Sequence, residues 1–437
     1  MKDKIFLFKY FLYKKTAIDF CKSLAYSQFY EEDRSAQDTF NKFISLFNFA
    51  FNNSPYYRSK YLEAGLTPQL IKSIDDIKNI PILTKQEVKN NFQKMLTVSP
   101  DHNNLVKCAT GGSTGIPMPY YHNKKLPLEA FAWRYLSWWG LKPWDNGAYI
   151  WRMTRKGKLS NLINQFAWWP VRKIRLDAAS LDKNTFDKFI FKLNKFKPKL
   201  LQGYIGAVYE FALYLNERNI KINSPKAIWV TSAPVSEFQR ELIEKVFNAP
   251  LYDEYGSSEV PWIAAQCNIK NHLHINTEGR YLEIVNKNNN GLGDIVVTDL
   301  LNYDFPLIRY ELNDRTRFIE QPCNCGRTLP LIEAVKGRSG EVIQIPGIGK
   351  IDPSYLTTIF DDHINSIRAF QIIQYKDFSI TLKIVPNYTY QNWKIEVEKV
   401  YNELVSKVKG KINVNLQECK EIRSDRGKTR YIISEIN

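Results

Sequence analysis

The sequence contains few cysteines, and its first residues include no long apolar run. Six cysteines in 437 residues are too few for a disulfide scaffold, which excludes a small disulfide-rich secreted protein. The stretch from Met1 to Lys15 has only four-residue apolar runs, interrupted by Lys9 and Lys14. These runs are too short for a signal peptide or a transmembrane helix, so we expect a cytoplasmic protein.

The chain also lacks the patterns of nucleic-acid-binding proteins. Its net charge is +16, yet no RNP motif, recognition-helix pattern or arginine-rich arm accompanies the lysines. Only the start is densely basic, with five lysines and one aspartate between Met1 and Lys15. We interpret the charge as attraction to small anionic ligands such as nucleotides and expect no nucleic-acid partner, with binding to a membrane surface or to nucleic acid as the alternative.

A run rich in glycine and hydroxyl groups is the candidate phosphate loop: Thr110-Gly111-Gly112-Ser113-Thr114-Gly115. Glycines let backbone amides approach an anion, and hydroxyls add donors or metal ligands. No lysine follows the last glycine, which excludes the P-loop of the G-x-x-x-x-G-K-[ST] class. A triphosphate held here would need positive charge from elsewhere in the chain. A solvated surface loop would have the same composition.

Hydroxyl groups and apolar spacing predict the first helices. Ser73 and Thr84 each stand three residues before an acid, as in a capping box, and therefore mark short helix starts. The apolar spacing predicts helices over 38–51 and 126–139 and a strand over 147–152.

Helices and strands alternate in the middle of the chain. Three helical patterns and three short apolar runs follow one another: 186–196, 200–204, 208–218, 227–231, 236–247 and 251–253. This alternation predicts a mostly parallel sheet with helices on both faces and ligands beyond the carboxyl ends of its strands. Two loops at such ends carry polar groups, Thr231-Ser232-Ala233-Pro234 and Asp253-Glu254-Tyr255-Gly256-Ser257-Ser258-Glu259. The second suits a purine and a metal ion beside phosphates, although a plain turn has similar residues.

The pattern changes again beyond Gly279. Hairpin strands are expected at 281–285 and 293–298, and a third is expected to run through 306–310 and to end near residues 313–314. The tail is expected to form strands at 370–375, 379–385 and 412–416 and a helix at 391–408. We therefore predict an α/β protein with a large N-terminal domain (1–339) of mostly parallel sheets, flanking helices and a β-barrel-like subdomain, followed by a small mobile C-terminal α+β lid (340–437).

The order of these motifs resembles the adenylate-forming acyl/aryl ligase superfamily. Within it, the chain is similar to the phenylacetate-coenzyme A ligase-like branch, which includes members linked to capsule polysaccharide biosynthesis. The similarity runs from Ser54-Pro-Tyr-Tyr57 and Pro81-Ile-Leu-Thr-Lys85 to the C-terminus. It implies an AMP-forming carboxylate ligase that uses ATP and Mg²⁺ to form an acyl-adenylate and releases pyrophosphate. Acyl transfer to coenzyme A, or to an amine or hydroxyl group of a sugar, would follow.

The resemblance assigns roles to the glycine-rich loop and to the two strand-end loops. The family's counterpart of Thr110 to Gly115 closes over the ATP phosphates, which makes Thr114 a candidate catalytic residue. The counterpart of Ser232-Ala233-Pro234 borders adenine. In the second strand-end loop, where Glu254 is also expected to bind the nucleotide, Tyr255 corresponds to the tyrosine that packs on adenine and Glu259 to the glutamate that serves Mg²⁺.

Further roles fall on the second half of the chain. Asp314 is the implied ribose ligand, and Asn313 replaces the family's usual glycine, a position that asparagine tolerates better than most residues. Arg338 belongs to the implied hinge motif, in which Gly340 stands for one of the family's two acids. Lys428 matches the lysine that reaches the acyl carboxylate and the α-phosphate, and it would supply the cation that the glycine-rich loop lacks.

The resemblance also implies a metal site. Cys267, His274, Cys323 and Cys325 would form a closed tetrahedral set for a structural Zn²⁺, because three thiolates and an imidazole leave no position for substrate. Some members of the branch carry zinc at these positions. His272 is a rival to His274, and buried free thiols are the alternative to a metal site.

Two other functions remain open. Gly340 and Asn313 suggest a nucleotide-binding scaffold without catalysis, and the basic start suggests a membrane-surface binding protein. The sequence does not identify the acid or the acceptor, although Tyr204, Gly206, Ala207 and Trp262 flank the implied acid pocket. The oligomeric state, with a homodimer as one option, is also open.

Overall fold

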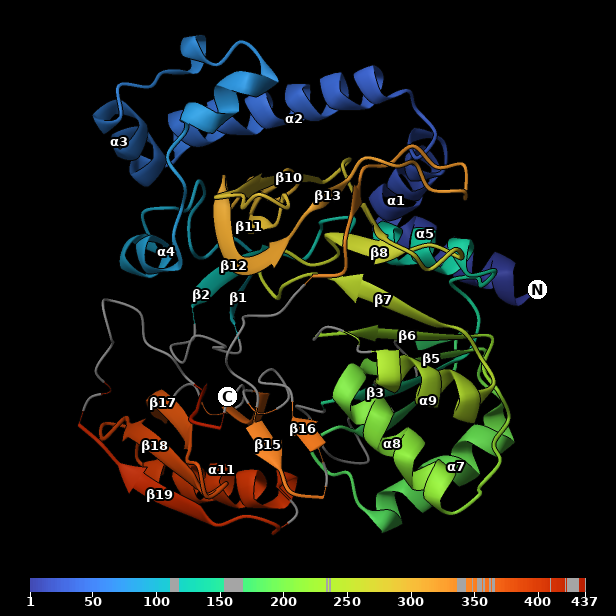
Figure 1. The fold of residues 1–437 in the computed structure, drawn as a ribbon. Helices are drawn as coiled ribbons and strands as arrows, with labels where there is room; N and C mark the ends of the chain where they lie inside the picture. The colour runs from blue at the N-terminus through green and yellow to red at the C-terminus, as the bar shows by residue number, and fades with distance from the viewer. Residues whose placement is uncertain are drawn as a thin grey trace. The chain divides into compact units, whose positions relative to one another are not determined.

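The chain divides into two compact units. The computed structural model describes residues 1–110, 118–152, 168–232, 235, 237–335, 343–347, 349–351, 356, 358–360, 363, 366–408, 410–420, 422 and 432–436 (Figure 1). The first unit comprises Met1–Cys108 and Pro119–Gly337, and the second comprises Ala109–Met118 and Arg338–Asn437. None of the described helices combines the length and the apolar character needed to cross a membrane.

The first unit is built on a large mixed sheet. Its parallel strands are β3 (Gly147–Trp151), β4 (Lys173–Asp177), β5 (Leu200–Tyr204), β6 (Ala227–Thr231) and β7 (Leu251–Tyr255). Its antiparallel strands are β8 (Ala264–Gln266), β9 (Leu273–Ile275), β13 (Phe318–Ile319) and β14 (Leu331–Ile332). The described strands follow the order β13-β14-β9-β8-β7-β6-β5-β3-β4. The alternating pattern of the sequence correctly predicted the parallel half.

Helices cover both faces of the parallel strands (Figure 1). One face packs against α7 (Lys183–Phe196), α8 (Ile205–Glu217) and α9 (Glu237–Phe247), and the other against α5 (Glu129–Trp138), which contacts α1 (Lys2–Ser27). Because successive strand side chains point to opposite faces, Leu201 packs among α7–α9 whereas Leu200 packs with α5. The sheet therefore has a hydrophobic core on each side.

The chain is helical from Lys2 to Asn91. It contains α1, α2 (Glu32–Asn53), α3 (Pro55–Glu63), two 3₁₀ turns (Pro68–Leu70 and Ile74–Asn79) and α4 (Lys85–Asn91). Both predicted capping boxes form: at the second, the Glu87 backbone N–H donates to the Thr84 hydroxyl over 3.1 Å. The helix predicted from residue 38 begins at Glu32, and α1 was not predicted.

Two smaller sheets complete the first unit. Strands β10 (Arg280–Val285), β11 (Gly293–Asp299) and β12 (Tyr310–Thr316) form an antiparallel sheet, and β1 (Leu105–Ala109) pairs with β2 (Pro119–Asn123). The strand predicted from residue 306 to about 313–314 forms only from Tyr310 onward, as β12, so its start was predicted four residues too early. The residue before it, Arg309, has a left-handed φ of 49°, which interrupts extended backbone.

The second unit is a small α+β structure with its own core. Its elements are β15 (Ile343–Ile345), β16 (Gly349–Ile351), a 3₁₀ turn (Thr358–Phe360), β17 (Ile367–Gln374), β18 (Ile380–Pro386), α11 (Trp393–Lys407), β19 (Val414–Glu418) and β20 (Ile432–Ser434). The four-stranded sheet has the order β19-β18-β17-β20. Side chains such as Ile372, Leu382 and Val400 are fully buried between this sheet and α11. The strands and the helix predicted for this region form, with ends shifted by one to three residues.

Candidate nucleotide site and cysteine–histidine cluster

Polar residues gather where β6 and β7 end. The two strands run in parallel, with Val230 paired to Asp253, so that Thr231 and Glu254 become neighbours. The Thr231 hydroxyl donates to the Glu254 carboxylate, and both side chains are buried. Burial raises the pKa of Glu254 to about 7. This edge of the sheet therefore holds a carboxyl group that changes charge near neutral pH.

The loops after these strands have tightly fixed backbones. Ser232, directly after β6, has a φ of 83°, a strained value for a residue with a side chain. A Cβ atom on Gly256 would lie 2.7 Å from the backbone nitrogen of Trp262, so this position needs glycine because of close packing. The turn closes where the Ser257 backbone N–H donates to the Val260 carbonyl over 3.0 Å. The turn places Glu259 in a buried position.

Strand β12 brings two more polar residues to the same site. The Tyr255 hydroxyl donates to the Asp314 carboxylate over 3.0 Å, and the Tyr310 hydroxyl donates to Oε1 of Glu259 over 2.9 Å. Tyr255, Glu259 and Asp314 were the residues predicted to contact adenine, Mg²⁺ and ribose. All three belong to the first unit, where Tyr255 contacts Asp314 of β12 and Glu259 contacts Tyr310 of the same strand, from segments far apart in the sequence.

Asn313 has a left-handed backbone conformation. Its φ is 61°, in the region where asparagine is better tolerated than most residues. Asp314 follows it directly in β12.

The sequence did not predict the contacts that hold the start of β12. Leu83 and Tyr310 form an isolated parallel β-bridge: the Leu83 backbone N–H donates to the Arg309 carbonyl over 2.8 Å, and the Leu83 carbonyl accepts from the Glu311 backbone N–H over 3.0 Å. The Arg309 side chain is 4% exposed and pairs with Glu283 at 2.9 Å. These contacts hold Tyr310 in place beside Glu259. The similarity at Pro81–Lys85 was the signal in the sequence, but it carried no role.

Most of the other predicted site residues lie outside the part of the chain that the structure describes. Thr110 is buried, and its hydroxyl accepts from the Met118 backbone N–H over 3.0 Å, which joins the two ends of the glycine-rich loop. Ser258 is exposed in the turn before Glu259. The remaining predicted residues lie outside the described ones: Gly111, Gly112, Ser113, Thr114, Gly115, Ala233, Pro234, Arg338 and Lys428. Their roles stay predictions.

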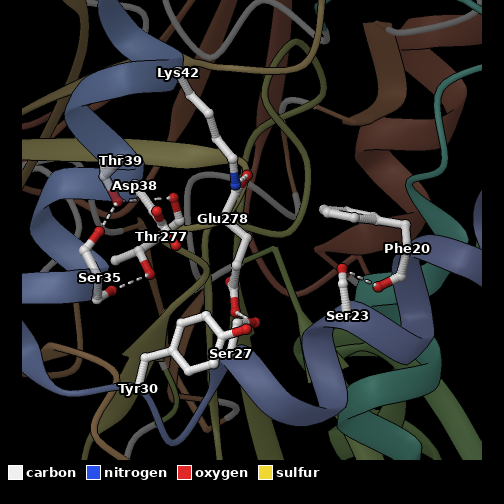
Figure 2. Close-up of a pocket in the computed structure, with 10 residues that line it drawn as sticks. All are labelled: Phe20, Ser23, Ser27, Tyr30, Ser35, Asp38, Thr39, Lys42, Thr277 and Glu278. Carbon is white, nitrogen blue, oxygen red and sulfur yellow. Dashed lines mark hydrogen bonds between the residues drawn. The ribbon is translucent and has the colours of Figure 1, made fainter.

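A polar pocket lies away from these residues, between α1, α2 and the loop after β9 (Figure 2). Its centre is the buried Glu278, which pairs with Arg134 at 2.6 Å and accepts from the Ser27 hydroxyl at 2.5 Å. Lys42 donates to the Glu278 carbonyl over 3.0 Å. These polar groups bond to one another, and none of the predicted site residues lines the pocket. We therefore interpret it as a structural junction.

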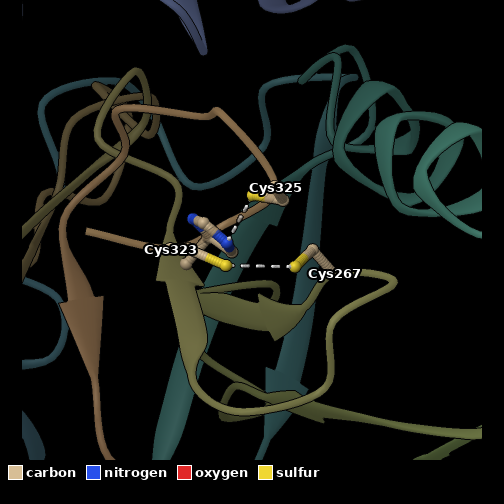
Figure 3. Close-up of side chains that lie close together, drawn as sticks. Cys267, Cys323 and Cys325 are labelled. Atoms are coloured by element: carbon tan, nitrogen blue, oxygen red, sulfur yellow. Dashed lines mark hydrogen bonds between the residues drawn. The ribbon is translucent and has the colours of Figure 1, made fainter. Parts of the chain in front are cut away.

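Four candidate metal ligands form one cluster. The ligand atoms of Cys267, His274, Cys323 and Cys325 all lie within 4.8 Å of one another, and Figure 3 shows the three cysteines converging. The Cys267 and Cys323 sulfurs are 3.7 Å apart, and the Cys325 sulfur is 3.4 Å from Nε2 of His274. Cys267 follows β8, His274 lies in β9, and the other two belong to the loop between β13 and β14.

The donors of this cluster fit Zn²⁺. A tetrahedral ion about 2.3 Å from two thiolates holds their sulfurs ~3.8 Å apart, close to the observed Cys267–Cys323 separation. Burial is the main reason that the pKa of His274 is lowered to about 4, so its imidazole is neutral, as a ligand must be. His272 is not part of the cluster. All six cysteines are free thiols, which excludes a disulfide between Cys267 and Cys323.

The chain is similar in sequence to a CapK protein and to phenylacetate-coenzyme A ligases. Residues 345–435 match the family of CapK C-terminal domains. The chain is 27% identical to protein CapK of Staphylococcus aureus over 435 residues, and the match covers 95% of this chain and 94% of that protein. It is 21% identical over 403 residues to the phenylacetate-coenzyme A ligase of Pseudomonas putida, covering 89% of this chain and 83% of that one.

The fold is similar to that of solved ligases. A 2-hydroxyisobutyryl-CoA ligase in complex with 2-HIB-AMP and CoA gives a TM-score of 0.64 at 17% identity, over 94% of this chain and 92% of that chain. The same ligase with R3-HIB-AMP gives 0.62 at 17% identity, over 94% and 91%. These matches confirm the adenylate-forming ligase fold. With the sequence relatives, they confirm the resemblance to the phenylacetate-coenzyme A ligase-like branch and its capsule-linked members.

Proposed function

We propose that this homologue of CapK and of the phenylacetate-coenzyme A ligases is an AMP-forming carboxylate ligase. It would convert a carboxylic acid and ATP into an acyl-adenylate and pyrophosphate, and then transfer the acyl group to an acceptor. The observation that supports this proposal best is the convergence of Tyr255, Glu259 and Asp314. One hydrogen bond joins Tyr255 to Asp314 of β12, and another joins Glu259 to Tyr310 of the same strand.

The chemistry of each residue suits its proposed role. The Tyr255 ring offers an apolar surface to a purine, and the carboxylate of Asp314 can accept hydrogen bonds from ribose hydroxyls. Glu259 supplies a carboxylate oxygen, the ligand type that Mg²⁺ prefers. Bound Mg²⁺ would offset the charge that builds up when a carboxylate attacks the α-phosphorus.

The glycine-rich loop and Lys428 complete the proposal on the strength of the sequence alone. Thr110 to Gly115 would hold the phosphates, and Lys428 would bring the positive charge that this loop lacks. We expect Lys428→Ala to abolish adenylation but to leave a preformed acyl-adenylate usable for acyl transfer. Full pyrophosphate exchange in Lys428→Ala would refute that assignment.

Carboxylate-dependent exchange between ATP and labelled pyrophosphate tests the function. We expect exchange with at least one member of a panel of aryl and aliphatic acids, and a loss of about a hundredfold in Glu259→Gln, which removes a metal ligand. Glu217→Gln, which changes an exposed glutamate on α8, is the matched control. Calorimetric binding of ATP without exchange for any acid would instead support a nucleotide-binding scaffold without catalysis.

The acceptor needs a separate measurement. Coenzyme A is one candidate, and the similarity to CapK makes an amine or hydroxyl group of a surface-polysaccharide sugar the other. Once an acid is known, AMP release can be compared with coenzyme A and with amino sugars as acceptor. We also propose a cytoplasmic location, because all six cysteines are free thiols and three of them are arranged, with His274, as metal ligands.

A further inference from the structure

The first half of α1 exposes a row of large apolar side chains. Leu7, Phe8, Phe11 and Leu12 are 42%, 65%, 54% and 59% exposed, respectively. At about 100° per residue, these four positions fall on one side of the helix. Phe6, on the other side, is only 4% exposed. A contiguous apolar face of this kind marks an interaction surface.

Packing on the opposite side fixes the orientation of this half of the helix. The Phe6 and Tyr10 rings stack with centroids 4.5 Å apart, and both contact Trp133 of α5 at 5.8 Å and 4.9 Å. Backbone angles outside the helical range at Lys14, with φ −148° and ψ 51°, separate this half from the rest of α1. The exposed apolar row therefore cannot turn inward while Phe6 and Tyr10 stay packed.

The same face is basic. Lys4 is exposed at a position on the side of Phe8 and Phe11, whereas Lys15, beyond the break at Lys14, is paired with Asp19 at 2.5 Å. Nearby, Lys9 donates to the carbonyl of Trp169 over 3.0 Å, and the Trp169 side chain is 57% exposed. The one acid among the first fifteen residues, Asp3, is paired with the N-terminal ammonium group at 2.9 Å.

We propose that this aromatic and basic face of α1 rests on the surface of a membrane that contains anionic lipids. The face consists of Leu7, Phe8, Phe11 and Leu12 with Lys4 and the adjacent Lys9 and Trp169. Its apolar side chains enter the boundary between headgroups and acyl chains, while its lysines contact lipid phosphates. The helix lies along the surface, since no described helix is able to span a bilayer.

Charge selects a lipid surface over a second copy of the chain. Two copies that meet through this face would bring their lysines together, in a chain whose net charge is +16. An anionic bilayer offers the opposite charge to the lysines and an apolar layer to the four apolar side chains. The face lies outside the residues assigned to the nucleotide, so membrane binding and adenylation can be tested separately.

Vesicle flotation with the full-length protein tests the proposal. The vesicles contain either phosphatidylcholine alone or phosphatidylcholine mixed with phosphatidylglycerol, and no ATP is added. We expect the protein to float with the mixed vesicles and to dissociate as salt is raised, because salt screens the lysine–phosphate attraction. Equal binding to both kinds of vesicle, or none to the mixed ones, would overturn the proposal.

Two sets of substitutions separate the apolar and the basic contributions. Phe8→Ser with Phe11→Ser should lower partitioning at least tenfold for each residue, and Lys4→Gln should lower it about fivefold. Phe191→Ser and Lys188→Gln, which change exposed residues of α7, are the matched controls and should bind as the wild type does.

Further readouts keep the result interpretable. The thermal midpoint and pyrophosphate exchange of the Phe8→Ser, Phe11→Ser variant and of Lys4→Gln in solution should equal those of the wild type, because the changed side chains are exposed. Wild-type binding by the Phe8→Ser, Phe11→Ser variant would overturn the proposal. So would sedimentation that shows a wild-type dimer and a monomeric Phe8→Ser, Phe11→Ser variant, since the face would then bind a second copy.

Discussion

Glu259 depends on a neighbouring hydroxyl for its orientation. Tyr310 donates to Oε1 of this buried carboxylate, and hydrogen bonds to charged groups contribute about 1.5–3 kcal/mol. We expect Tyr310→Phe to raise the Mg²⁺ concentration needed for half-maximal exchange and to lower kcat about tenfold. Exchange rates measured over a Mg²⁺ titration check this, with Tyr26→Phe, at a 71% exposed side chain, as control. An unchanged Mg²⁺ dependence would show that Tyr310 does not orient Glu259.

Asp253 makes stability depend on pH. Burial within β7 raises its pKa from 3.8 to about 7. Between these values the folded chain binds more protons than the unfolded chain, so the free energy of unfolding falls as pH rises from about 4 to about 7. At about 1.4 kcal/mol per unit, we expect Asp253→Asn to be up to ~4 kcal/mol more stable than the wild type at about pH 8, with little difference near pH 4.

Urea unfolding at several pH values measures this difference. The wild type should lose stability between about pH 4 and pH 7, and Asp253→Asn should lose less. Asp182→Asn, at an exposed helix cap, is a control that should keep the wild-type pH dependence over this interval. Equal pH dependence in Asp253→Asn and the wild type would contradict the burial argument.

The sequence predicted single residues best where their chemistry is local. Asparagine at position 313 was expected to tolerate a glycine conformation, and its φ is 61°. The φ of 83° at Ser232 and the need for glycine at 256 were not predictable, because the first depends on how the chain leaves β6 and the second on Trp262, which is close only in the fold. The hydrogen bond between Tyr310 and Glu259 was missed for the same reason, because its two residues are far apart in the sequence.

At the scale of elements, the apolar pattern of the sequence predicted the helices and strands whose burial repeats regularly along the chain. The helices of the parallel half were found because each carries one buried face, and its strands were found because burial on both faces makes them short apolar runs. Helix α1 was missed because its first half is apolar on both sides, one side packed on Trp133 and the other exposed, so it has no helical period. The start of β12 was misplaced because the left-handed Arg309 looks like a strand residue in the sequence.

The cysteine–histidine cluster should stabilise the short elements that carry it. Strands β8 and β9 have three residues each, so a bound ion that joins them to the loop between β13 and β14 adds cross-links that packing does not supply. We expect about one zinc per chain by elemental analysis and a lower thermal midpoint in Cys325→Ser. Cys419→Ser, in the second unit, is the matched control. Absence of metal from the purified protein, or an unchanged midpoint in Cys325→Ser, would contradict a structural zinc.

At the scale of the whole molecule, the two units have separate hydrophobic cores, and the metal cluster belongs to the first. We therefore expect two calorimetric transitions on heating. The fluorescence of the ten tryptophans should follow mainly the first unit, because only Trp393 lies in the second.

Removing zinc with a chelator should lower the temperature of the transition seen by fluorescence and leave the other transition unchanged. Binding of AMP at a hundred times its Kd should raise that same transition, by about 2.7 kcal/mol in unfolding free energy. One transition reported alike by calorimetry and fluorescence, or two that the chelator shifts equally, would mean that the two cores unfold as one.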